Sequence, residues 1–156
     1  MPTALFPAPL QKGDTLGIIA PAGQLYDKDR FTDGVRILRE MGFQVTFPRN
    51  LWPGTTYLAD SDKGRALEFN DLLRNSDIKG LIALRGGYGC LRILDRIDLS
   101  LVTQNPKIIV GFSDISILQN YLYGKTGLVS LHGPVVTSLG AMTRESLSSL
   151  FNGLTG

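Results

Sequence analysis

The chain has 156 residues, of which 43% are hydrophobic and 19% are charged, and its formal net charge is +2 at pH 7. This composition is typical of a globular domain with a buried core, and it excludes an intrinsically disordered chain. Lysine and arginine are scattered along the sequence, so we expect neither a nucleic-acid-binding surface nor a basic membrane anchor. Because Cys90 is the only cysteine, no disulfide can form within the chain.

The two ends of the sequence lead to two expectations. The first residues carry no basic stretch and no long apolar core, and no window of the chain is long enough to span a bilayer. We therefore expect a cytoplasmic protein without a signal peptide. The last residues, 151–156, are rich in glycine and asparagine and resemble a linker, so we expect the chain to be a fragment of a longer protein.

Short apolar runs alternate with helical stripes along the chain. The pattern predicts strands over 16–20, 43–47, 78–84, 107–111 and 128–131, and helices over 29–41, 61–75, 90–95, 114–123 and 143–151. Ser61 and Thr143 are expected as N-caps, and Gly42 as the end of the first helix. Most predicted strands are continuous apolar runs, which is typical of a parallel sheet covered on both faces. The predicted fold is therefore an α/β domain of three layers.

Four turns that contain glycine or proline follow predicted strands. They are residues 21–23, 85–89, 111–114 and 132–134. In open α/β sheets, binding sites form beyond the carboxyl ends of the strands. We therefore expect these four turns to meet along one edge of the sheet.

The turn Gly111-Phe112-Ser113-Asp114 lies between a predicted strand and a predicted helix, which is the arrangement of a nucleophile elbow. There Ser113 would be an exposed nucleophile, and the Asp114 amide at the helix N-terminus would stabilise an oxyanion. The sequence departs from the usual G-x-S-x-G pattern, because Ile115 stands at the last glycine position. The open alternative is that Ser113 or Asp114 simply caps the helix.

The turn that begins at Arg85 contains Gly86, Gly87 and Gly89. Glycines expose backbone N–H groups and permit positive φ angles, so this turn could hold an anion or supply a second oxyanion donor. It matches neither the P-loop pattern nor G-x-G-x-x-G. The open alternative is an ordinary connection between a strand and a helix.

Two further residues could carry nucleophilic chemistry. Cys90, at a predicted helix start, is the second candidate nucleophile, and a buried structural cysteine is the alternative. His132 is the only histidine and is either a base for a serine nucleophile or a structural residue. With one histidine, one cysteine and no paired ligand spacing, the sequence predicts no metal site.

Four motifs occur in a fixed order along the chain: "IIAPAG", "ALRGGYGCLRILDRID", "KIIVGFSDIS" and "SLHGP". Together they resemble the LD-carboxypeptidases of serine peptidase family S66, which includes muramoyl-tetrapeptide carboxypeptidase and the microcin immunity peptidases. The resemblance extends over residues 13–151. It implies a flavodoxin-like or class I glutamine-amidotransferase-like N-terminal domain with a nucleophile elbow, here residues 1–156, and a C-terminal domain outside this chain.

The resemblance also implies roles for individual residues. By motif, Ser113 corresponds to the nucleophile, and the amides of Asp114 and of one of the pair Gly86 and Gly87 correspond to the oxyanion hole. The family's catalytic glutamate and histidine lie in the C-terminal domain, so His132 is not expected to belong to the triad. The chain by itself is therefore expected to be nearly inactive.

The reaction implied by the resemblance is hydrolysis, without a cofactor, of the L,D-amide bond before a terminal D-alanine in cytoplasmic murein tetrapeptides. Arg85 and Tyr88 are expected to contact the substrate, and Arg85 would bind the terminal carboxylate of the substrate. The open alternative is that Arg85 is an exposed turn residue. The implied partners are this peptide, the protein's own C-terminal domain and, in a homodimer, a second copy. Two alternatives stay open: an S66 peptidase that acts on peptidyl or acyl-sulfamoyl nucleotides, and a non-catalytic, anion-binding flavodoxin-like domain.

Overall fold

The computed structural model describes residues 2–156 and contains a five-stranded, all-parallel sheet with strand order β2-β1-β3-β4-β5. The strands are β1 (Thr15–Ile19), β2 (Gln44–Thr46), β3 (Ile78–Ala83), β4 (Ile108–Gly111) and β5 (Leu131–His132). This is the flavodoxin-type order, in which the direction of winding reverses between β1 and β3. The predicted α/β fold is confirmed.

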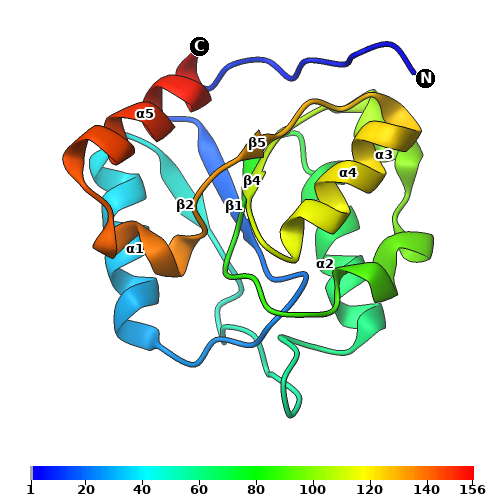
Figure 1. Ribbon diagram of the computed structural model, residues 1–156, viewed down its shortest axis with the longest axis horizontal. Coiled ribbons are helices and arrows are strands. Elements are labelled where there is room, and N and C mark those ends of the chain that lie inside the picture. The colour runs from blue at the N-terminus through cyan, green and yellow to red at the C-terminus, as the bar shows by residue number, and fades with distance from the viewer. Residues whose placement is uncertain (1) are drawn as a thin grey trace.

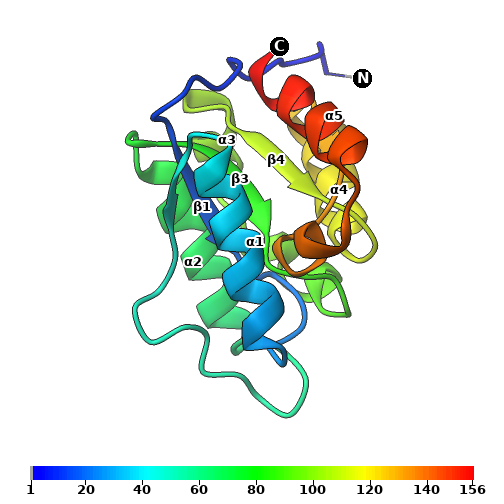
Figure 2. The ribbon, with the colours of Figure 1, turned by 90° about the vertical axis from the view of Figure 1, so that its left-hand side faces the viewer.

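Helices cover both faces of the sheet. The α-helices are α1 (Lys28–Glu40), α2 (Asp62–Arg74), α3 (Leu99–Gln104), α4 (Ile115–Thr126) and α5 (Arg144–Thr155), and the 3₁₀ helices are η1 (Cys90–Arg96) and η2 (Val136–Ala141). In Figure 1, α1 and α5 lie on one side of the sheet, and α2, α3 and α4 lie on the other. Figure 2 views the molecule from the side that α1 and α5 cover. No helix within residues 2–156 is both long and apolar enough to cross a membrane.

The core consists of two apolar clusters, one on each face of the sheet. Successive side chains of a strand point to opposite faces. In β1, Ile18 accordingly joins the cluster under α1 and α5, whereas Ile19 joins the cluster under α2 and α4. In β4, Val110 and Ile109 divide in the same way, and all four side chains are fully buried. Burial on both faces explains why these strands are uninterrupted apolar runs in the sequence.

The predicted helix boundaries rest on identifiable contacts. Ser61 caps α2, with its Oγ accepting a hydrogen bond from Gly64 N at 3.0 Å. Thr143 caps α5 in the same way, accepting from Ser146 N at 3.2 Å. Gly42 follows α1 with φ +99°, a left-handed conformation that favours glycine. The expected caps and helix end are therefore confirmed.

The predicted fifth strand exists as β5, but it begins at Leu131, three residues later than the predicted start at 128. Leu128 instead forms a parallel bridge with Leu5 of the N-terminal segment, whose amide donates to Gly127 O at 2.8 Å. Pairing with β4 begins only at Leu131. The N-terminal segment, which is far away in the sequence, therefore pairs with the first part of an apolar run that the sequence pattern predicts to be one continuous strand.

Two short helices, α3 and η2, were not predicted, and both have six residues. An element of this length shows too little of the helical period to be recognised. Helix α3 depends instead on its cap, because Asp98 Oδ1 accepts from Ser100 N at 3.0 Å. The short helix expected over 90–95 exists as the 3₁₀ helix η1.

Candidate active site

Turns that follow different strands meet at the carboxyl edge of the sheet, on its lower side in Figure 1, and enclose a cavity of about 380 Å³. The turn after β3 contributes Arg85, Gly86 and Gly87 to its lining. The turn after β4 contributes Phe112 and Ser113. Two of the four turns that the sequence singled out thus meet directly in one cavity.

The rest of the lining was not predicted from the sequence. Tyr26, Asp27 and Arg30 reach the cavity from the start of α1, and Thr137 and Ser138 reach it from η2. Asp27 is the only carboxylate in the lining, and it pairs with Arg30 at 3.5 Å. These residues lie far from the glycine turns in sequence, and no motif connects them.

Ser113 adopts a strained backbone conformation at the tip of a sharp turn. Its φ angle is +63°, in the left-handed region, and its side chain is exposed. Such a conformation costs a residue with a side chain about 1–2 kcal/mol. The turn is tight enough that a Cβ at Gly111 would lie 2.6 Å from Ile115 Cγ2. The fully buried Ile115 therefore packs over Gly111, which accounts for the departure from the G-x-S-x-G pattern.

The alternative that Ser113 or Asp114 caps α4 through its side chain is wrong. Asp114 occupies the N-cap position, but no side chain makes a capping hydrogen bond there. The Asp114 carboxylate points to the neighbouring turn instead, where its Oδ2 accepts from Cys90 N at 2.9 Å. The side chain of Asp114 thus joins the turn after β4 to the turn after β3.

The turn after β3 lies directly against Ser113. A Cβ at Gly86 would be 3.1 Å from Ser113 Cβ and 3.3 Å from its Oγ. Gly87 follows with φ +128°. Among residues 2–156, the amides of Gly87 and Asp114 donate no intramolecular hydrogen bond. The Asp114 amide directly follows Ser113 in the chain, and Gly87 lines the same cavity as Ser113, so these two N–H groups are candidate donors to a developing oxyanion.

Arg85 is held at the side of the cavity by backbone carbonyls. Its Nε donates to Gly86 O at 3.2 Å, and its Nη1 donates to Gln24 O at 3.3 Å. The guanidinium also lies over the Tyr26 ring, 5.1 Å from the ring centroid. These contacts leave Nη2 free of hydrogen bonds to the part of the chain described here. A fixed guanidinium with free N–H groups can bind a carboxylate.

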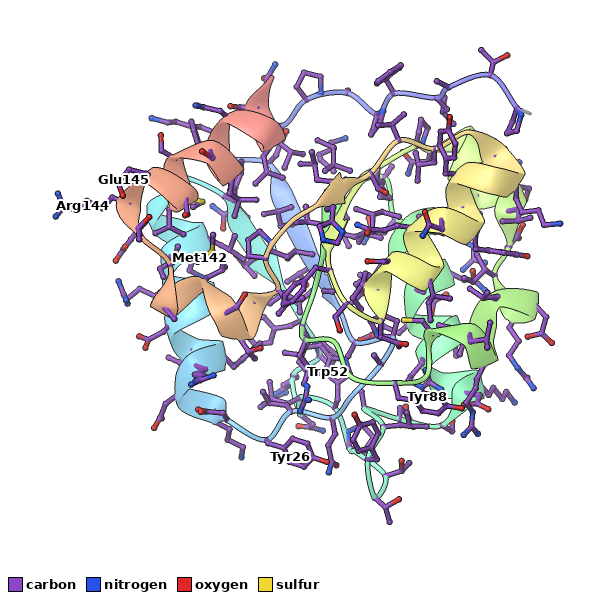
Figure 3. All side chains as sticks on the ribbon, viewed as in Figure 1. Tyr26, Trp52, Tyr88, Met142, Arg144 and Glu145 are labelled. Carbon is purple, nitrogen blue, oxygen red and sulfur yellow. The ribbon has the colours of Figure 1, made fainter. Side chains whose placement is uncertain are left out.

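Tyr88 does not line the Ser113 cavity. Its side chain is 53% exposed and belongs to a neighbouring cavity of about 610 Å³, which Tyr57 and Arg92 also line. Figure 3 shows Tyr88 and Tyr26 at the same lower end of the molecule, on different loops. A substrate contact with Tyr88 would therefore have to be made beyond the glycine turn.

Cys90 and His132 are both unsuited to act with Ser113 in this structure. Cys90 is fully buried, and its burial raises the pKa of the thiol above its ordinary range, which disfavours the nucleophilic thiolate. His132 lies outside the Ser113 cavity, with its Nδ1 3.4 Å from Ser116 Oγ and its ring 6.5 Å from that of Phe112. The turn at His132 follows β5 at the carboxyl edge of the sheet, as expected, but it does not line the cavity that contains Ser113.

A partly buried carboxyl group supports the turn after β1. Glu68 of α2 accepts hydrogen bonds from Ala20 N at 3.0 Å and from Trp52 Nε1 at 2.6 Å. Burial raises the pKa of Glu68 to about 7, with a smaller contribution from the nearby charge of Asp60. Within residues 2–156, no three His, Cys, Asp or Glu side chains gather closely enough to hold a metal ion.

Comparisons with known proteins agree with this geometry. Residues 16–133 match the family model Peptidase_S66, described as the LD-carboxypeptidase N-terminal domain. The chain is 36% identical to the "Probable murein peptide carboxypeptidase" of Bacillus subtilis strain 168, over 93% of this chain and 47% of the relative. It is 37% identical to the microcin C7 self-immunity protein MccF of Escherichia coli, over 85% of this chain and 39% of that protein.

Among solved structures, the MccF-like protein of Bacillus anthracis strain Ames superposes with a TM-score of 0.92 at 30% identity. The match covers 98% of this chain and 48% of that structure. The chain thus spans about half the length, or less, of the proteins that it matches. From the family match, these identities and the shared fold, it follows that the chain belongs to the S66 peptidase family.

Proposed function

We propose that this chain supplies the nucleophile of a serine-type LD-carboxypeptidase, and that the nucleophile is Ser113. The observation that carries the proposal is the backbone of Ser113, which is held at φ +63° on a strand-turn-helix elbow. Costly conformations of this kind cluster at functional sites and persist only where the surrounding structure holds them. The side chain opens into a cavity that also contains the glycine turn and Arg85.

The proposed reaction is an acyl transfer. Ser113 Oγ attacks the carbonyl carbon of the scissile amide and passes its proton to a general base, and the amides of Asp114 and Gly87 stabilise the resulting oxyanion. The amine of the leaving amino acid departs with a proton from that same base, and water then hydrolyses the acyl-enzyme. The base is a histidine, oriented by a glutamate, from the protein's C-terminal domain.

The proposed substrate is a cytoplasmic murein tetrapeptide, cleaved before its terminal D-alanine. The name of the B. subtilis relative supports this substrate class. Arg85 would bind the terminal carboxylate through its free N–H groups, which suits an enzyme that removes one residue from a C-terminus. The partners proposed with this activity are the C-terminal domain and a second copy of the protein.

A second candidate function is cleavage of peptidyl or acyl-sulfamoyl nucleotides. It is favoured by the 37% identity to MccF, a microcin C7 self-immunity protein, which is as high as the identity to the murein peptide carboxypeptidase. The two candidates share the nucleophile and differ only in substrate. Turnover of a murein tetrapeptide and of an aminoacyl-sulfamoyl adenosine by the same preparation of the full-length protein separates them.

The nucleophile is tested in the full-length protein that contains this chain. We expect Ser113→Ala to abolish both peptide turnover and covalent labelling by a fluorophosphonate reagent, and residues 1–156 alone to show almost no turnover. Turnover that survives Ser113→Ala would refute the proposed function. Ligand binding without turnover or labelling in the wild-type protein would favour the anion-binding domain instead.

A further inference from the structure

One peptide unit of the glycine turn is held from both sides by charged groups. The carbonyl oxygen of Gly89 accepts a hydrogen bond from Arg65 Nη1 at 2.9 Å. The N–H group of the same peptide, which belongs to Cys90, donates to Asp114 Oδ2 at 2.9 Å. A guanidinium and a carboxylate thus fix the orientation of the Gly89–Cys90 peptide. Hydrogen bonds to charged groups are the stronger ones in proteins.

The Arg65 side chain is held in place by burial and by several hydrogen bonds. It is fully buried, and it donates to the carbonyl oxygens of Pro21 and Asp60 as well as to that of Gly89. Its charge is balanced by an ion pair with Asp62. A buried arginine whose hydrogen bonds all go to turn backbone and one carboxylate is a fixed support.

The contact between Arg65 and the Gly89 carbonyl requires a glycine at position 89. Its φ angle is +125°, and a Cβ at this position would lie 2.9 Å from Arg65 Nη1 and 2.8 Å from Leu58 Cδ2. Only glycine can take the conformation and leave room for the guanidinium. The glycine that ends the turn is therefore required by the Arg65 contact.

The two charged groups connect three turns. Arg65 joins the turn after β1, at Pro21, to the turn after β3. The Asp114 carboxylate joins the turn after β3 to the turn after β4, where Ser113 is the preceding residue. At its other end, the glycine turn is held by Gly23 N, which donates to the Gly86 carbonyl at 3.3 Å. Both ends of the loop that carries Gly87 are thus bonded to neighbouring turns, and the Cys90 end is bonded to the residue after Ser113.

We propose that Arg65 and the Asp114 carboxylate form a clamp on the Gly89–Cys90 peptide, and that this clamp positions the Gly87 amide against Ser113. Both side chains are positioning residues, because they act through the glycine turn. The inference rests on the proposed function, in which Gly87 N–H stabilises the oxyanion. Displacement of a catalytic donor by about 1 Å can cost roughly 10²-fold in rate.

The test compares Asp114→Ala, Asp114→Asn and Arg65→Lys in the full-length protein. We expect Asp114→Ala to lower kcat about 10²-fold with little change in KM, since the donor acts in the transition state. Asp114→Asn retains an oxygen that can accept the Cys90 N–H bond, so we expect it to restore about tenfold of that loss. Arg65→Lys keeps the buried charge but not the fork of donors, and we expect kcat to fall about tenfold. Asp98→Ala, which removes the cap of α3 far from the site, is the matched control.

A second readout follows the clamp without relying on catalysis. In the folded wild-type protein, the buried Cys90 thiol should react slowly with iodoacetamide. We expect Arg65→Lys, which keeps the positive charge beside the thiol, to accelerate alkylation of Cys90, measured by mass spectrometry, about tenfold or more, and Asp98→Ala to leave it unchanged. Wild-type kcat in the Asp114→Ala and Arg65→Lys proteins, or a lower kcat of Arg65→Lys without faster alkylation, would overturn the clamp. A refutation of the proposed function can be told apart from this result, because turnover would then survive Ser113→Ala.

Discussion

Ser113 and Gly86 face each other so closely that a Cβ at position 86 would lie 3.1 Å from the Ser113 Cβ and 3.3 Å from its hydroxyl oxygen. Gly86 has no positive φ angle, unlike Gly87 and Gly89 in the same turn. The absence of a side chain at Gly86 is therefore required by proximity to Ser113, and the backbone itself would accept alanine.

This proximity predicts the effect of Gly86→Ala. The added methyl group must displace either the Ser113 side chain or the glycine turn by a few tenths of an ångström. We expect kcat/KM of the full-length protein to fall about 10²-fold, while the free energy of unfolding changes by no more than about 1 kcal/mol. Gly124→Ala, at an exposed position of α4 where a Cβ meets nothing within 4 Å, is the control. It should leave kcat/KM unchanged, and a Gly86→Ala enzyme of wild-type activity would contradict the close approach.

The strained conformation of Ser113 predicts a difference between two inactive variants. Ser113→Ala keeps a Cβ at φ +63°, whereas Ser113→Gly relieves this strain. Glycine also raises the backbone entropy of the unfolded state, which offsets part of the gain. We expect Ser113→Gly to be more stable than Ser113→Ala by about 0.5–1 kcal/mol, measured by urea denaturation of the 156-residue chain. If Ser113→Gly proved the less stable of the two, the strain at this position would be refuted.

Most of the fold could be predicted because the strands are buried on both faces and the helix caps act locally. The start of the fifth strand could not be predicted, because a bridge between Leu5 and Leu128 depends on a contact between residues far apart in the sequence. The same reason applies to the lining of the cavity. Tyr26 and Thr137 reach it through the packing of α1 and η2, which no local pattern encodes.

The glycine turn and the serine elbow could be found from the sequence, because glycine and sharp turns leave local signals. The clamp could have been suspected from one signal. Arg65 stands four and eight residues before Phe69 and Leu73, on the buried stripe of α2, and a charge at such a position needs buried partners. No comparable signal exists for the Asp114 carboxylate, since its partner Cys90 N belongs to another turn.

His132→Gln tests whether the only histidine of this chain takes part in the reaction. The His132 ring contacts Ser116 and Phe112 and lies outside the Ser113 cavity. We therefore expect the full-length His132→Gln protein to keep kcat within about threefold of wild type and an unchanged dependence of kcat on pH. A loss of 10²-fold or more, on the scale of a lost general base, would make His132 the base and contradict a base from the C-terminal domain.

Glu68 predicts a pH dependence of stability. Its pKa is about 7 in the folded protein, against an ordinary value of 4.5, so between these values the folded state binds a proton that the unfolded state has released. The contribution of protonated Glu68 to the free energy of unfolding is therefore fully present below pH 4.5 and is lost as the pH rises through 7. Solvent screens the partly exposed side chain and reduces the effect, so we expect the free energy of unfolding to decrease by about 2 kcal/mol across this window.

Urea denaturation of the 156-residue chain between pH 4.5 and 8 measures this decrease, and Glu68→Gln should flatten it because a glutamine side chain does not titrate. Trp52, the only tryptophan, donates to Glu68 at 2.6 Å, so its fluorescence should titrate with a midpoint near pH 7 in the wild type and not in Glu68→Gln. Glu40→Gln, at an exposed surface position, should behave like the wild type. Equal pH profiles for the wild type and Glu68→Gln would show that the Glu68 carboxyl is already ionised well below pH 7.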